Sequence, residues 1–206
     1  MEALQVLDWR RRVTALYADV RNRSETAPRA AHALWRSGRD RLFAEHPASP
    51  LPPQDRSGFT GLPVAPYDPD LRLVAEARPV DAAVPEEDRE YSYPTGTDGV
   101  VAFTRAGTVD LTGVGEVGVW WHAGYGGGIF LPLRDGLAGE RTFGGGRYVL
   151  DTVKGADLGG TDGSLVVDLN FAYNPSCAYD PEWACPLAPP ANQVPADVLA
   201  GELLPG

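Results

Sequence analysis

The sequence predicts an α+β protein that is mainly β, with an N-terminal helical hairpin packed on an antiparallel β-barrel or sandwich-like sheet. Apolar residues recur at helical spacing over the first 46 residues, and from about Gly58 they alternate as they do in strands. The 24 Gly and 19 Pro residues are most frequent in the later part of the chain, where they separate short elements. Because 206 residues suit one domain, we expect a single domain with a hairpin over 1–46 and a β-rich body over 58–206.

Two amphipathic helices are expected before residue 46, because apolar residues lie three or four positions apart in both. We expect Thr26 to cap the second helix, with Pro28 tolerated in its first turn, and His46-Pro47 to end it. The predicted buried faces consist of Val6, Trp9, Val13, Leu16, Tyr17 and Val20 in the first helix, and of Ala31, Leu34, Trp35, Gly38, Leu42 and Phe43 in the second.

Alternating segments in the body predict six strands, at 71–78, 100–105, 117–122, 129–134, 147–152 and 164–171. Glycine-rich turns separate the later ones: "TGTDG", "AGYGGG", "GGGR" and "LGGTDG". The charged run "EEDRE" at 86–90 is interpreted as a solvated loop.

The charge distribution excludes several classes of partner. The net charge is −10, although residues 1–41 hold nine Arg against five acidic residues. An acidic body argues against nucleic acid, whose binding depends on basic clusters. We find no long apolar run and no signal peptide, so we expect a cytoplasmic protein with reduced thiols and no membrane partner. The oligomeric state stays open.

Two polar residues are unusual in the segment 164–171, since Asp168 and Asn170 would share one face of a strand and both are poor strand formers. They could form the polar floor of a pocket. They could instead anchor backbone N–H groups of the following loop, which we weigh somewhat higher.

A second polar group is expected where two strands meet. If 129–134 pairs with 147–152, then Arg134, Asp135 and Arg147 gather near one end. Such a group could bind a carboxylate or phosphate, but an internal salt bridge is the commoner arrangement. The glycine triplets lack the spacing of a phosphate-binding loop, and dinucleotide, hydrolase and metalloprotease motifs are missing, so no cofactor is expected.

The two cysteines, Cys177 and Cys185, are separated by seven residues. Zinc knuckles use about two to four, so we expect no metal. A site with His122 and Asp168, a disulfide, and a nucleophilic pair with His122 are the alternatives. The leading interpretation is a pair of buried reduced thiols that act as small apolar groups.

Long stretches of the chain resemble the uncharacterised DUF1684 family of bacterial and archaeal proteins, and most closely its actinobacterial members. The resemblance rests on "RDGLAGERTFGGGRYVLD", on "LVVDLNFAYNPSCAYDPEWACPLAPPANQ" with the later "AGE", and on the section from "ALWRSGRDRLF" to "APYDP". It covers 9–202. Many relatives have Phe at Leu169 and Arg at Phe171, so an arginine after the Asn cannot belong to a mechanism here. Residues that match the family pattern are Arg134, Asp135, Arg147, Tyr148, Asp168, Asn170, Tyr173, Asn174, Cys177, Cys185 and Asn192.

The resemblance implies a family and no activity. Our first hypothesis is a small-molecule-binding β-barrel whose pocket lies under a Pro-rich strap, residues 172–195. Its candidate lining is Arg134, Asp135, Arg147, Tyr148, Asp168, Asn170, Tyr173 and Asn174, and Cys177, Cys185 and Asn192 would support the strap. The second hypothesis is a hydrolase or isomerase with Asp168 as base and Arg147 or Arg134 as anion clamp. The third is a structural or partner-binding protein.

Overall fold

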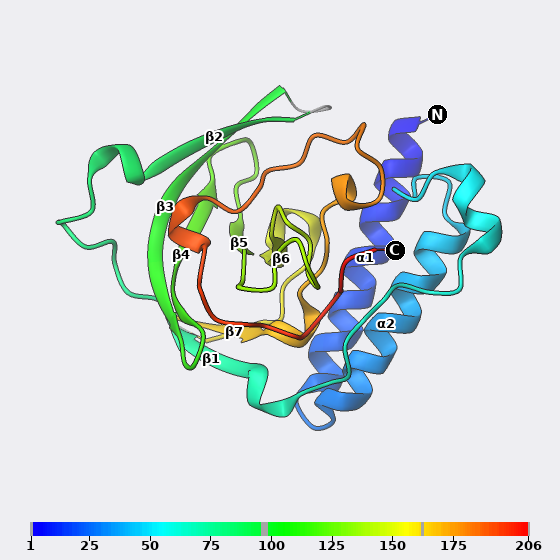
Figure 1. Ribbon diagram of the computed structural model, residues 1–206, viewed down its shortest axis with the longest axis horizontal. Helices are drawn as coiled ribbons and strands as arrows, with labels where there is room; N and C mark the ends of the chain where they lie inside the picture. The colour runs from blue at the N-terminus through cyan, green and yellow to red at the C-terminus, as the bar shows by residue number, and fades with distance from the viewer. Residues whose placement is uncertain (1, 96–98, 162, 206) are drawn as a thin grey trace.

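The computed structural model describes residues 2–95, 99–161 and 163–205. Two helices open the chain, and antiparallel sheets of five and two strands follow. Figure 1 shows the helices on one side of the molecule and β2–β4 on the other, with β1 and β7 running between them. The expected α+β class is confirmed. The barrel is not found, because across the described residues the larger sheet stays open, with β2 and β6 as its edges.

The helical hairpin consists of α1 (Glu2–Ser24) and α2 (Pro28–Glu45). A Cβ at Gly38 would lie 2.6 Å from a methyl carbon of Leu16, so this glycine permits the close approach of the two helices. The expected cap at Thr26 is wrong. The N-cap is Ala27, and no side-chain hydrogen bond caps the helix. Helix α2 begins at Pro28, which is a favourable first residue, so Thr26 lies one residue before the N-cap position.

The five-stranded sheet is an antiparallel meander whose spatial order follows the sequence. Its strands are β2 (Glu90–Thr95), β3 (Gly99–Leu111), β4 (Gly115–His122), β5 (Ile129–Leu133) and β6 (Arg147–Asp151). The predicted turns "TGTDG" and "LGGTDG" include residues 96–98 and 162, which lie outside the described part of the chain.

The sequence did not predict strand β2. The loop expected at 86–90 overlaps with this strand at Glu90, which is the first residue of β2. The loop is a 3-10 turn over Glu86–Asp88, after which the chain enters the sheet. β2 is an edge strand, which tolerates Pro94. Its Tyr91 ring stacks on Phe103 of β3 with centroids 4.7 Å apart, so aromatic packing outweighs the charged sequence before it.

Strand β3 extends beyond its predicted end because a bulge between Arg105 and Gly107 lets the ladder continue. A Cβ at Gly107 would lie 2.6 Å from the carbonyl oxygen of Arg78. Glycine therefore allows the chain that leaves β1 to pair with β3 at Thr108.

The smaller sheet pairs β1 (Arg72–Glu76) with β7 (Ser164–Asp168). β7 is shorter than predicted, because a 3-10 helix over Leu169–Phe171 replaces its end. The Asp168 carboxylate accepts a hydrogen bond from the backbone N–H of Asn170 and caps this turn. The alternation of faces therefore stops at Asp168, and residues 167–171 are all buried.

Short 3-10 helices complete the chain. They are η1 (Pro53–Gly58), η2 (Pro69–Leu71), η3 (Glu86–Asp88), η4 (Thr152–Lys154), η5 (Leu169–Phe171), η6 (Ser176–Ala178) and η7 (Pro190–Asn192).

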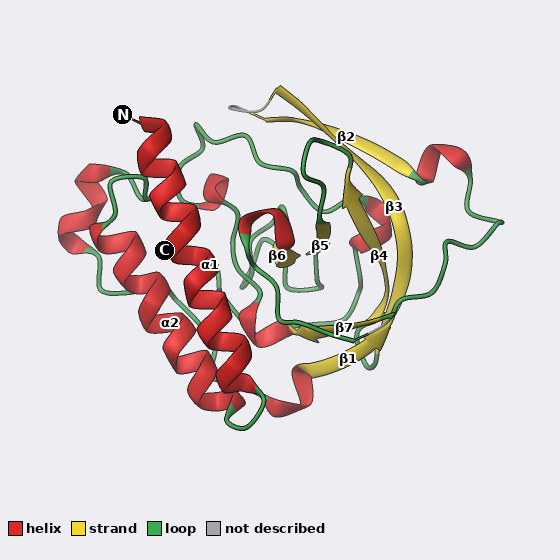
Figure 2. Ribbon diagram, turned by 180° about the vertical axis from the view of Figure 1, so that it is seen from behind, coloured by secondary structure: helices red, strands yellow, loops and turns green. Residues whose placement is uncertain are grey.

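Three apolar clusters hold these parts together. The largest fills the space between the two sheets, around Val109, Leu131 and Val167. A second joins the helices to the body, where Trp35 packs edge-on against Phe171 at 5.4 Å. The third is aromatic and lies on β3–β6, and Figure 2 shows that these strands and α1 frame the middle of the molecule.

Candidate functional site

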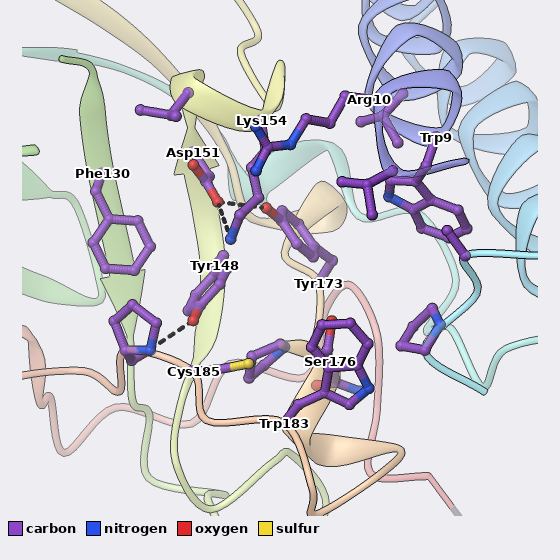
Figure 3. Close-up of a pocket in the computed structure, with 18 of the residues that line it drawn as sticks. Trp9, Arg10, Phe130, Tyr148, Asp151, Lys154, Tyr173, Ser176, Trp183 and Cys185 are labelled. Atoms are coloured by element: carbon purple, nitrogen blue, oxygen red, sulfur yellow. Dashed lines mark hydrogen bonds and ion pairs between the residues drawn. The ribbon is translucent and has the colours of Figure 1, made fainter. Parts of the chain in front are cut away.

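A cavity of about 370 Å³ lies between α1, the aromatic cluster of the larger sheet and the strap, residues 172–195. Its wall comes from segments far apart in sequence, which the fold brings together as Figure 3 shows. Helix α1 contributes Trp9, Arg10 and Val13; the sheet contributes Val101, Phe103, His122, Phe130, Tyr148 and Asp151; the turn after β6 contributes Val153 and Lys154; and the strap contributes 173–176 and 183–186.

Most of this wall is apolar and aromatic. Phe130 stacks on Phe103 with centroids 5.0 Å apart, and Tyr148 packs edge-on against Phe130 at 4.8 Å. Trp9 approaches from α1, and Trp183 approaches from the strap (Figure 3). A cavity with an apolar and aromatic wall accommodates flat or aliphatic groups, because binding removes their apolar surface from water.

The polar end of the cavity is built on Asp151, the last residue of β6. Its Oδ2 accepts hydrogen bonds from the Tyr173 hydroxyl at 3.3 Å and pairs with Lys154 Nζ at 3.2 Å. The one-turn helix η4 folds Lys154 back over its own strand. The Asp151 side chain is 7% exposed and the Lys154 side chain 50%, so the ammonium group keeps donors that the carboxylate does not use.

The charge of Lys154 is stabilised at this position. The nearby Asp151 carboxylate raises the pKa of Lys154 above its usual value, against the effect of burial. Arg10 projects from α1 toward it and acts in the opposite direction (Figure 3). The polar end therefore presents two cations beside one carboxylate, in a protein whose net charge is −10.

Two tyrosines connect the sheet to the strap. The Tyr148 hydroxyl donates to the carbonyl oxygen of Pro186 at 2.6 Å. The backbone of Tyr148 pairs with Tyr173 in both directions, at 2.8 and 2.9 Å. Burial raises the pKa of both phenols well above 10, so both stay protonated donors.

The cysteine pair lies in the strap, and Cys185 borders the cavity. Both thiols are free and half-buried. The neighbouring Cys177 thiol and the charge of Lys154 lower the pKa of Cys185 below its usual value, against the effect of burial.

Of the predicted lining residues, Tyr148, Tyr173 and Asn174 border the cavity. Asn174 is mostly buried there. Its backbone N–H donates to Glu202 Oε2 at 2.8 Å, and its amide nitrogen donates to the carbonyl oxygen of Leu203.

The predicted arginine cluster lies elsewhere, behind the strap. Arg147 and Asp135 form a fully buried ion pair at 2.8 Å. Arg147 also donates to the carbonyl oxygens of Val198, Ala200 and Glu202, and so holds the C-terminal segment against β6. Arg134 turns away and donates to the carbonyl oxygen of Gly144 at 2.9 Å.

Asp168 and Asn170 also lie apart from the cavity, among the buried residues between β7 and the chain before β1. The Asp168 carboxylate accepts from Asn170, from the Tyr67 hydroxyl and from Arg72. Asn170 donates to the carbonyl oxygen of Asp68 and accepts from its N–H, both at 2.7 Å. The pair thus anchors the segment at 67–72.

Asn192 supports the strap from inside the fold. Its amide oxygen accepts from Trp120 Nε1 at 2.6 Å, and its amide nitrogen donates to the carbonyl oxygens of Gly118 and Pro132, both at 2.8 Å. This residue ties the strap to β4 and β5.

Lys154, Asp151, Arg10 and Trp9 were not singled out from the sequence as members of a site. One signal was available, because Lys154 is the only lysine of the chain, beside seventeen arginines. Trp9 and Arg10 carried no comparable signal, since an amphipathic helix does not reveal what its apolar face covers.

Among the residues that the structure describes, no group of three or more His, Cys, Asp or Glu side chains is placed to hold a metal ion. Neither helix has the length and apolar character needed to cross a bilayer.

Comparison with known proteins finds a family and solved structures that are similar to this chain. The family model described as "Protein of unknown function (DUF1684)" matches residues 57–203. An uncharacterised protein of Haloarcula marismortui, solved by NMR, is similar at 32% sequence identity with a TM-score of 0.54. The similarity covers 82% of this chain and 89% of that one. No curated protein matches.

Proposed function

The chain belongs to the DUF1684 family, and we propose that it binds a small, mainly apolar molecule that carries a hydrogen-bond-accepting group. The observation that carries this proposal is the cavity between α1, the sheet and the strap, with Lys154 at its polar end. Its volume of about 370 Å³ falls in the range typical of small-molecule sites, roughly 300–1,000 Å³.

The wall chemistry favours an apolar body for the ligand. Phe103, Phe130 and Trp9 present ring faces and edges, and aromatic walls bind flat or aliphatic groups through apolar burial and ring contacts. The proposal therefore keeps the expected pocket under the strap and assigns it a different set of lining residues.

The polar end favours a group that accepts hydrogen bonds, such as a carboxylate or carbonyl. The ammonium group of Lys154 has three N–H donors and forms an ion pair with Asp151. This pair does not occupy all three donors, so donors remain free for a ligand in the cavity that Lys154 lines. Arg10 adds a second cation nearby. Glu2 also borders the cavity, but it lies two turns earlier on α1, about 12 Å along the helix axis from Arg10.

The two rival hypotheses have less support. The hydrolase or isomerase was assigned to Asp168 with Arg147 or Arg134, and these three residues are engaged in bonds outside the cavity. A purely structural protein would have no need to keep an aromatic cavity of this size open, because apolar residues that fill a void stabilise a core.

The test is a binding assay with a matched ligand series. An environment-sensitive naphthalene sulfonate dye reports occupancy of the cavity, and medium-chain and aryl carboxylates, their primary amides and their amines then compete for it. We expect the carboxylates and amides to displace the dye and the amines to fail, because an ammonium group cannot accept a hydrogen bond from Lys154.

The matched variants are Lys154→Met, which keeps the length of the side chain, and Arg36→Met at an exposed position on α2. Lys154→Met should weaken carboxylate binding by about tenfold or more, which corresponds to about 1.4 kcal/mol. Arg36→Met should leave it unchanged. Equal affinities for carboxylate, amide and amine, or an unaffected Lys154 variant, would overturn the proposal.

A further inference from the structure

The face of the larger sheet that borders the cavity carries a row of three aromatic rings between two polar groups. Phe103, Phe130 and Tyr148 form the row, and neighbouring ring centroids lie 5.0 and 4.8 Å apart. Lys154 Nζ lies 5.6 Å from the centre of the Tyr148 ring, at the end of the row that Figure 3 shows. At the other end, the His122 ring packs edge-on against Phe103 at 5.5 Å. All five residues line the cavity, so the row forms one wall of it.

The strand register explains why the row lies on one face. Phe103 of β3 pairs with His122 of β4, and Phe130 of β5 pairs with Asp151 of β6. Trp120, two residues before His122, pairs with Phe130, so both pairs share a face of the sheet. Strand β5 lies between β4 and β6, and two strand spacings separate these strands by about 10 Å. His122 and the Asp151–Lys154 pair therefore mark opposite ends of the wall.

The His122 ring offers a hydrogen-bond donor that the protein does not use. Its Nδ1 accepts from the backbone N–H of Gly124 at 3.2 Å, which places the proton of the neutral ring on Nε2. In the part of the chain that the structure describes, no group accepts a hydrogen bond from this Nε2–H. A Cβ at Gly124 would lie 2.5 Å from His122 Cε1, so the turn after β4 closes tightly on the ring. The ring is only partly buried, and a ligand in the cavity can reach its free donor.

The charge of the wall differs between its two ends. Among the described residues, the lysine and arginine side chains of the wall are Lys154, Arg10 and Arg39. The first two lie together at the polar end, and Arg39 is paired with the buried Glu202 at 2.5 Å. No unpaired lysine or arginine of the wall is thus left for the His122 end. An uncharged acceptor suits His122 better than a second carboxylate, because a carboxylate that leaves water needs a cation.

We propose that the ligand is an elongated apolar acid with an uncharged acceptor group at its far end, and that His122 binds this group. The inference rests on the proposed binding function and names a ligand class for it. Lys154 holds the carboxylate, the aromatic row covers the apolar body, and His122 selects the length. The separation of about 10 Å corresponds to a chain of about eight to ten carbon atoms, with a carbonyl or hydroxyl group at the end.

The test measures competition with the dye by linear acids of increasing chain length. Each length is supplied as the plain acid and as the acid with a terminal methyl ketone. The readout is the affinity of the keto acid divided by that of the plain acid of equal length, which removes the contribution of the chain. We expect this ratio to pass through a maximum at the length that spans the row, because only there does the carbonyl oxygen reach His122 Nε2.

Two substitutions separate the donor from the ring. His122→Phe keeps a ring against Phe103 and removes the donor, whereas His122→Gln gives up the ring and keeps an N–H group at similar reach. His122→Phe should lower the maximal ratio by about fivefold, the effect of one hydrogen bond, and His122→Gln should preserve most of it. The dye affinity of each variant shows whether the cavity is intact.

The outcomes distinguish this inference from the binding proposal. If plain acids displace the dye and Lys154→Met weakens them, but the ratio has no maximum or is unchanged in His122→Phe, the role of His122 is wrong and the binding function stands. A ratio that falls in Ser176→Ala and persists in His122→Phe would assign the acceptor to the strap, and it also overturns the inference. Failure of every acid to displace the dye overturns both proposals.

Discussion

The Asp168 carboxylate lies at the end of β7 with none of its surface exposed, and every contact that it makes is structural. Its oxygens accept from Asn170, Tyr67 and Arg72, and so fix the chain before β1. Lys154 is the opposite case, since half of its side chain is exposed and its partner uses only part of its donors. For a single residue, unused hydrogen-bonding capacity distinguishes a site from an anchor.

Asp168→Asn should destabilise the protein by about 1–3 kcal/mol, because an amide nitrogen at this position cannot accept the bonds that the carboxylate receives. Asp110→Asn, on the exposed face of β3, should change stability by less than about 0.5 kcal/mol. Urea unfolding at neutral pH gives both values. A loss at Asp168 no larger than the loss at Asp110 would contradict the anchoring role.

The stability difference between Asp168→Asn and the natural protein should also depend on pH. Burial raises the pKa of Asp168 above its usual value of 3.8, against hydrogen bonds from Asn170 and the charge of Arg72. A carboxyl group that binds its proton more tightly in the folded state stabilises the fold more as the pH falls through this raised pKa. The difference between the natural protein and Asp168→Asn should therefore grow as the pH of the urea series falls from neutral toward 3.8, and a difference that shrinks would show that the charged form is the favoured one.

At the scale of elements, the C-terminal segment, residues 198–203, connects helix α2, strand β6 and the strap through hydrogen bonds. Glu202 is fully buried, and its carboxylate accepts from Arg39 of α2 at 2.5 Å, from the Tyr179 hydroxyl at 2.7 Å and from the backbone of Asn174. Arg147 holds the carbonyl oxygens of the same segment from the other side. One acidic residue near the end of the chain thus joins the hairpin to the strap.

Arg39→Met should destabilise the protein by about 3–5 kcal/mol, since it leaves the Glu202 charge buried without its cation. Arg41→Met, exposed on the same helix, is the matched control and should have little effect. In Arg39→Met/Glu202→Gln the charge is removed as well, so part of the loss should be recovered. Chemical unfolding of these three variants and of Glu202→Gln decides the point, and a loss in the double variant equal to the sum of the losses in Arg39→Met and Glu202→Gln would argue against direct coupling.

The elements also show what the sequence could predict. Periodicity located both helices and placed β4, β5 and β6 within about two residues, because those strands alternate between regular turns. It failed at β2, whose position depends on Tyr91 meeting Phe103, and at the end of β7, where Asp168 caps a 3-10 turn. The residues of the candidate site were harder to predict than the elements. Trp9, Lys154 and Cys185 are brought together by tertiary packing, and no local pattern contains that information.

At the scale of the whole molecule, the hairpin and the body share one core. Trp35 of α2 is fully buried, packs edge-on against Phe171 and donates from its ring nitrogen to the Tyr17 hydroxyl at 3.1 Å. The cavity is lined by both parts, so it exists only while the hairpin is docked. We therefore predict one domain that unfolds in a single cooperative step.

Trp35→Ala tests this unity. It removes a large side chain from the shared core, and we expect a loss of about 3–5 kcal/mol. Because the hairpin and the body stabilise each other through this contact, the loss should lower one transition, seen at the same temperature by far-ultraviolet circular dichroism, near-ultraviolet circular dichroism and the cavity dye. Tyr125→Ala, at a fully exposed aromatic residue, should leave that temperature unchanged. If the dye signal is lost well before the sheet melts in Trp35→Ala, the hairpin undocks by itself, and the molecule is two cooperative units joined at the cavity.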